Sequence, residues 1–169
     1  VIDAGKAMAA LLTNRRDLMD YLEVIGKGMP LTEAPAPCIA IPTTAGTGSE
    51  VGRSGVVTPD GAGSKGMFFH PELLAKCVFL DPELTTGLPP GLTAATGLDA
   101  LTHCIESYTS PVFQPLCDGI ALEGIALIIH ALPAAVADGS DIDARGHMLV
   151  AAAMGGRLES KPCGMSTQT

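Results

Sequence analysis

The chain has 169 residues, of which 47% are hydrophobic and only 4% aromatic, and it contains no Trp. This length allows one ordinary domain or two small ones, and the composition predicts an aliphatic core. The formal net charge of −8 argues against nucleic acid or an anionic membrane surface as a partner.

No apolar run approaches the ~18 residues that a membrane span needs, and the first residues show no basic, apolar signal pattern. We therefore expect no membrane partner. The cysteines are odd in number and widely spaced, without a C-x-x-C pair, which favours buried thiols in a reducing cytoplasm over a disulfide framework or a zinc cluster. They are Cys38, Cys77, Cys104, Cys117 and Cys163.

The first half of the chain alternates between helical and strand patterns. Apolar residues at helical spacing predict a helix over residues 2–12, and residues 15–28 read as a second short helix or turn. Three prolines then lead into the apolar run CIAIP, which predicts a strand. Three further runs predict short strands, because each is β-branched or aromatic and bounded by turn residues; they are SGVVTP, GMFFH and CVFLD.

After Asp81 the strand signals end, and periodic apolar runs predict three helices. We expect them over residues 92–108, 115–130 and 141–158. The sequence thus predicts an α/β portion over residues 1–88, followed by an all-helical portion over residues 89–169.

The loop TTAGTGSEV directly follows the first predicted strand. Glycines allow a ligand to approach the backbone closely, and hydroxyl and N–H groups can hold phosphate or ribose oxygens. An ordinary strand-to-helix turn has the same composition, so the residues alone leave both interpretations open.

Asp99 and His103 lie four residues apart in the segment AATGLDALTHCIE, so a helix places them one above the other on the same face. A carboxylate and a neutral imidazole at this spacing can bind one metal ion. They can equally form a simple hydrogen bond. For His70, His130 and His147, surface or capping roles are the better interpretation, with His130 at the end of its helix.

Two segments together, IPTTAGTGSEV and DPELTTGLPPGLTAATGLDALTHCIESYTSP, resemble the iron-containing (group III) alcohol dehydrogenases. The resemblance extends from Val1 to about Gly156. It implies a partial nucleotide-binding α/β domain followed by a helical metal-binding domain, the dehydroquinate synthase-like architecture. It also implies hydride transfer between an alcohol or aldehyde and NAD or NADP, with Fe²⁺ or Zn²⁺ polarising the oxygen.

Site residues follow from the same resemblance. Asp99 and His103 match the first two of four metal ligands, which in the family are one Asp and three His. No catalytic acid or base is assigned. The residues that match the family's cofactor-binding segments are Thr43, Thr44, Gly46, Thr47, Ser49, Lys65, Leu84, Thr85 and Leu88.

The sequence departs from the family pattern at both ends. The Gly-Gly-Gly-Ser turn expected before VIDAGKA is absent, and the two remaining histidine ligands expected after Gly156 are replaced by RLESKPCGMSTQT. We therefore expect a fragment truncated at both ends. A shift of reading frame near Lys161 would explain the histidine-free tail.

The sequence therefore predicts part of a cytoplasmic oxidoreductase that acts on a small alcohol or aldehyde. Alternatives that stay open are an inactive remnant that binds cofactor, a helical assembly piece, and the maleylacetate reductase or glycerol dehydrogenase branch. Dimers and larger assemblies are common in the family, so a homo-oligomer is also expected.

Overall fold

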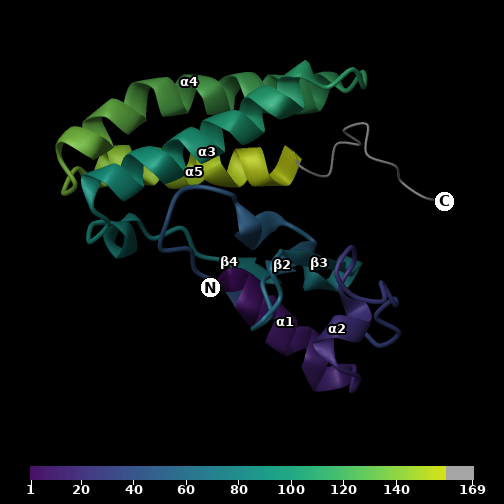
Figure 1. The fold of residues 1–169 in the computed structure, drawn as a ribbon. Coiled ribbons are helices and arrows are strands. Elements are labelled where there is room, and N and C mark those ends of the chain that lie inside the picture. Colours follow the sequence, from purple (N-terminus) through teal and green to yellow (C-terminus); the bar gives the residue numbers. More distant parts are fainter. Residues whose placement is uncertain (159–169) are drawn as a thin grey trace. The chain divides into compact units, whose positions relative to one another are not determined.

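The computed structural model describes residues 1–158, and the histidine-free tail lies almost entirely outside them. The elements in chain order are α1 Ile2–Thr13, α2 Leu18–Tyr21, β1 Ile39–Ala40, η1 Ser49–Val51, β2 Ser54–Val57, β3 Gly66–Phe69, η2 Pro71–Leu73, β4 Cys77–Val78, η3 Pro82–Thr85, α3 Pro90–Thr109, α4 Pro115–Ala137 and α5 Ile142–Leu158 (Figure 1). Each predicted helix and strand is thus present, with shorter strands.

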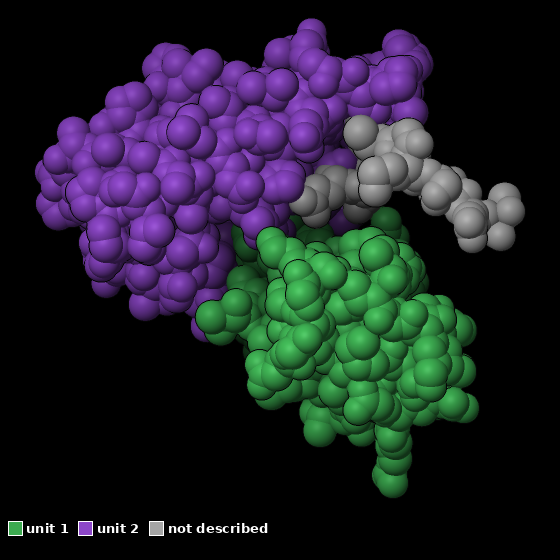
Figure 2. Space-filling view, in the orientation of Figure 1, with its two compact units in different colours: residues 1–40, 49–78 green, residues 41–48, 79–169 purple. Residues whose placement is uncertain are grey.

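The chain divides into two compact units (Figure 2). The first comprises residues 1–40 and 49–78, and the second comprises residues 41–48 and 79–169. The loop over residues 41–48 thus groups with the three long helices, although it directly follows β1. We describe each unit by itself.

The first unit holds two small two-stranded sheets and α1. Strands β1 and β4 pair in parallel, with Ile39 opposite Cys77, while β2 and β3 pair antiparallel, with Ser54 opposite Phe69. The core of this unit is apolar and combines residues of α1, α2 and β3 with loop residues: Ala7, Ala10, Tyr21, Leu22, Leu31, Phe68 and Leu73.

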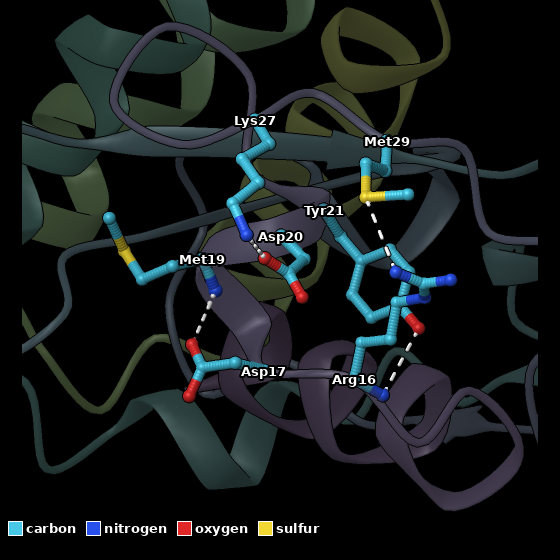
Figure 3. A network of polar contacts seen from close by, with 7 residues as sticks. All are labelled: Arg16, Asp17, Met19, Asp20, Tyr21, Lys27 and Met29. Carbon is cyan, nitrogen blue, oxygen red and sulfur yellow. Dashed lines mark hydrogen bonds and ion pairs between the residues drawn. The ribbon is translucent and has the colours of Figure 1, made fainter.

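The segment over residues 15–28 forms only the four-residue helix α2 and then turns back. The Asp17 carboxylate caps this helix by accepting from the Met19 N–H, and Lys27 pairs with Asp20 at 2.6 Å (Figure 3). A Cβ on Gly26 would lie 2.1 Å from the Met19 carbonyl oxygen. The reversal therefore requires glycine at position 26.

In the second unit, α3, α4 and α5 pack against one another (Figure 1). Small residues allow the close approach: a Cβ on Gly97 would lie 2.3 Å from Leu132 Cδ1, and one on Gly124 would lie 2.8 Å from Cys104 Sγ. The buried face of α3 recurs every three or four residues, as expected for a helix packed on one side; it comprises Thr93, Gly97, Ala100, Cys104 and Ser107.

One sequence-based prediction about α4 is wrong. The helix does not end near His130 but continues through Pro133 to Ala137, because buried Ala131 and Ala135 anchor its last turns in the core. Within the described residues, α4 is also long and apolar enough to span a membrane by length and composition alone. The mean hydropathy of its most apolar 18-residue window is 2.0. Polar residues interrupt each apolar run in α4, but they do not lower the mean hydropathy of the window below the level typical of a membrane span.

The thiols are more exposed than predicted. Cys104 is buried, but Cys77 is exposed, and Cys38 and Cys117 are half-buried. Each of these four thiols is free of disulfides.

Candidate functional site

Asp99 and His103 lie on α3, immediately beside its buried face. Ala100 and Cys104, one position further along, are fully buried, so the Asp99 and His103 side chains emerge at the rim of the helical core. Nε2 of His103 lies 3.7 Å from Oδ2 of Asp99, with side-chain exposures of 21% and 46%. Both donor atoms therefore point to one partly exposed position.

The pair has the chemistry of half a divalent metal site. A carboxylate oxygen and an imidazole nitrogen suit Fe²⁺ or Zn²⁺. Among residues 1–158, no three His, Cys, Asp or Glu side chains converge. The described residues therefore fit two of the ligands that such an ion needs, and further ligands would have to come from elsewhere.

The Gly- and Thr-rich loop lies directly against this pair. A Cβ on Gly46 would lie 3.5 Å from Oδ2 of Asp99 and 3.3 Å from Cβ of Thr96. Thr43, Thr44 and Thr47 are exposed on the same loop. The structure thus brings the predicted cofactor loop and the predicted metal pair side by side within one unit.

A glycine contact holds the end of this loop on α5. Gly48 has φ +65°, which glycine adopts without strain, and a Cβ there would lie 2.4 Å from the Ala152 carbonyl oxygen. A Cβ on Gly156 would lie 2.4 Å from the Gly48 carbonyl oxygen. Backbone therefore meets backbone at this point, and no side chain fits between them.

A small cavity joins the loop to the segment before α3. Predicted cofactor residues Thr85 and Leu88 line it together with Ala45 of the loop. The remaining lining residues come from the three helices and are Thr93, Thr96, Ala135, Arg145 and Met148. Two predicted cofactor segments therefore meet at one cavity.

The other predicted cofactor residues are scattered. Leu84 is half exposed in the second unit. Ser49 and Lys65 belong to the first unit, where the Ser49 hydroxyl donates to the Asp3 carboxylate at 2.5 Å and Lys65 is exposed before β3.

Of the remaining histidines, His70 caps η2 by accepting from the Glu72 N–H at 3.1 Å, which confirms its predicted capping role. His130 Nδ1 lies 2.8 Å from the Ala126 carbonyl oxygen on its own helix.

Lys6 and Arg145 are buried cations that the sequence did not predict. Lys6 is 2% exposed, and its ammonium donates to the carbonyl oxygens of Ser49, Gly52 and Ser54 at 2.7–2.9 Å. Arg145 is 3% exposed near the start of α5. The signal that could have identified Lys6 is its place four residues before Ala10, on the apolar face of α1.

Burial also shifts two pKa values. Desolvation raises the pKa of Glu50, which is 3% exposed in the segment that Lys6 binds, and the nearby ammonium opposes part of this shift. Burial likewise raises the pKa of the Cys104 thiol. A neutral, buried thiol is a poor nucleophile, so Cys104 acts in packing.

Comparison with known proteins decides the family. A model described as iron-containing alcohol dehydrogenase matches residues 1–82, and a model of the C-terminal region of the same family matches residues 93–161. The chain belongs to the iron-containing alcohol dehydrogenase family. The predicted resemblance is thereby confirmed over most of the sequence.

Individual relatives agree with this family assignment. The 4-hydroxybutyrate dehydrogenase of Cupriavidus necator is 45% identical over 96% of this chain and 42% of its own length. The choline dehydrogenase of Bacillus subtilis is 41% identical over 92% of this chain and 38% of its own length. The chain thus spans about two fifths of these curated relatives.

Solved structures of alcohol dehydrogenase relatives confirm the predicted fold class, a partial α/β region followed by helices. Sulfoacetaldehyde reductase from Bifidobacterium kashiwanohense, solved with NAD⁺, superposes with a TM-score of 0.85 at 37% identity, over 93% of this chain and 41% of that one. A 1,3-propanediol oxidoreductase gives 0.84 at 38% identity, over 93% and 40%.

Proposed function

We propose that this chain supplies part of an NAD-dependent alcohol dehydrogenase that transfers a hydride between an alcohol and its aldehyde or ketone. The observation that carries the proposal is the position of Gly46 against the Asp99 carboxylate. Hydride transfer needs the nicotinamide ring and the polarised carbon–oxygen bond within contact distance. A loop that binds the cofactor beside a metal ligand meets this need.

Asp99 and His103 would hold a divalent ion, with Fe²⁺ favoured by the family and Zn²⁺ as the alternative. When bound, this ion supplies Lewis-acid polarisation of the alcohol or carbonyl oxygen. The chain's own contribution is to orient the two donors: Ala100 and Cys104 anchor that stretch of α3 in the core, so the backbone that carries both donors is ordered before an ion binds.

The loop would orient the cofactor. Exposed hydroxyls of Thr43, Thr44 and Thr47 can donate to ribose or phosphate oxygens, and Gly46 allows the loop backbone to pack close to Asp99. Thr85 and Leu88, together with Leu84, would line the next part of the cofactor site. Ser49 and Lys65 are proposed cofactor contacts through the family resemblance alone.

The relatives named above are dehydrogenases or reductases of alcohols and aldehydes, which supports the alcohol dehydrogenase branch over maleylacetate reductase or glycerol dehydrogenase. We further propose a cytoplasmic location, in keeping with the disulfide-free thiols. A homo-oligomer is also proposed, since exposed apolar residues such as Leu116 and Ile129 on α4 could be covered by a second copy.

The function is tested on the purified 169-residue chain under anaerobic conditions. With Fe²⁺, NAD⁺ and a short primary alcohol, NADH should form, and His103→Ala should abolish its formation. If NADH binds but no turnover occurs, the chain is a cofactor-binding remnant. NADH affinity should fall in Thr43→Val and Thr44→Val and persist in Thr109→Val, an exposed position at the end of α3. Absence of both binding and turnover would contradict the proposal.

A further inference from the structure

Arg145 is a buried cation that forms no ion pair within residues 1–158. Its exposed fraction is only 3%, and its three hydrogen-bond acceptors are all neutral oxygens. Nε donates to the Gly139 carbonyl at 3.0 Å, Nη1 to the Thr93 hydroxyl at 3.0 Å, and Nη2 to the Leu88 carbonyl at 3.3 Å. Burying a charge is costly unless it is well hydrogen-bonded. These three bonds offset that cost, so the guanidinium is held firmly to the segments that supply its acceptors.

The three acceptors belong to two separate chain segments. Gly139 lies in the turn between α4 and α5, whereas Leu88 and Thr93 flank the start of α3. Thr93 itself donates to the Leu88 carbonyl at 3.3 Å. The guanidinium therefore fixes the bend that leads from η3 into α3 against the turn between α4 and α5.

This bend carries two of the proposed cofactor residues. Thr85 and Leu88 face Ala45 of the loop across the small cavity, and Arg145 itself lines that cavity. Arg145 donates from three different nitrogens held in a fixed planar fork, and a lysine, which carries all its donors on one nitrogen, cannot reproduce that arrangement. The geometry of the bend therefore depends on the fork and not on positive charge alone.

We infer that Arg145 is a positioning residue for the cofactor: it holds Leu88 and Thr85 in register with the Gly- and Thr-rich loop. The inference rests on the proposed function, because it assumes that NAD(H) binds along these segments. The Asp99 and His103 pair lies further along α3 than Thr93, the α3 residue whose hydroxyl Arg145 binds. Loss of the fork should thus weaken cofactor binding and spare metal binding.

The first test compares Arg145→Lys with Arg157→Lys, an exposed arginine on the same helix. NADH binding is measured by fluorescence titration and Co²⁺ binding by its absorption spectrum, on the full chain. Arg145→Lys should bind NADH about tenfold more weakly, the size expected for a lost charge-assisted hydrogen bond, with Co²⁺ affinity unchanged. In Arg145→Ala, added guanidine at low millimolar concentration should restore part of the NADH affinity.

Equal losses of NADH and Co²⁺ binding, or no rescue by guanidine, would show a purely structural role and overturn the inference. Arg157→Lys should match wild type in both assays.

A second measurement keeps the inference testable if wild type binds no NADH, in which case the proposed function itself has failed. Hydrogen exchange should then still be faster in Arg145→Lys over residues 85–93 than in wild type, with the middle of α4 unchanged. Unchanged exchange over residues 85–93 would overturn the inference independently of the cofactor.

Discussion

Gly48 and Gly156 touch through their backbones, so that a Cβ on Gly156 would lie 2.4 Å from the Gly48 carbonyl oxygen and 2.6 Å from its Cα. This contact fixes the end of the cofactor loop on α5. Because the obstacle is backbone and not a flexible side chain, neither partner can yield without moving the loop.

Gly156→Ala should therefore destabilise the second unit by about 1–3 kcal/mol, the usual cost of overpacking. Chemical denaturation followed by circular dichroism measures this. Gly119→Ala on α4 is the matched control, because a Cβ there meets nothing within 4 Å; it should stabilise the helix by about 0.5–1 kcal/mol. Equal effects of the two substitutions would show that the loop does not rest on α5.

Such a contact illustrates what the sequence could and could not predict. The i, i+4 spacing of Asp99 and His103 was sufficient to place both side chains on one helix face, because helix geometry is local. The proximity of Gly46 to Asp99 was not predictable from spacing, since it depends on how residues 41–48 leave β1 and pack on helices that lie about 50 residues later in the chain.

Local sequence patterns gave wrong predictions where tertiary packing outweighs local preference. Pro133 normally disfavours helix, yet the buried alanines on either side of it extend α4 to Ala137. The buried Lys6 and Arg145 look like solvent-exposed charges in the sequence, because their acceptors are uncharged oxygens, most of which belong to distant segments. The sequence carries no pattern for such acceptors.

The metal pair gives a direct binding prediction. Asp99→Asn should weaken Co²⁺ binding at least about tenfold, because one of two protein donors loses its charge. Isothermal titration measures the affinity. Glu106→Gln, an exposed carboxylate on the same helix, should bind Co²⁺ as wild type does. The pair is not the metal site if Glu106→Gln has the larger effect.

Lys6 should contribute strongly to the stability of the first unit. Lys6→Met retains the length of the side chain but leaves the Ser49, Gly52 and Ser54 carbonyls without their donor, which should cost about 3 kcal/mol or more. Urea unfolding gives the value. Lys27→Met removes only the exposed ion pair with Asp20 and should cost less than about 1 kcal/mol. Similar losses in both variants would contradict the clamp formed by Lys6.

Glu50 should make stability depend on pH. Burial raises its pKa above the ordinary 4.5, so as pH rises past 4.5 the unfolded chain releases this proton before the folded chain does. Folding stability from this group is thus present at low pH and declines as pH rises through the folded pKa. Glu50→Gln lacks this titration, so it should gain stability relative to wild type between pH 4 and pH 7 in urea unfolding. A relative loss over this range would contradict the shift.

The central claim is that the α3 donor pair and the Gly- and Thr-rich loop bind metal and nicotinamide side by side. Paramagnetic relaxation by Mn²⁺ of the nicotinamide protons of bound NAD⁺ tests it most directly, on the full chain. We expect strong relaxation that Asp99→Asn removes and Glu106→Gln leaves intact. Nicotinamide protons that bind to the chain yet relax no faster with Mn²⁺ than without it would contradict the account.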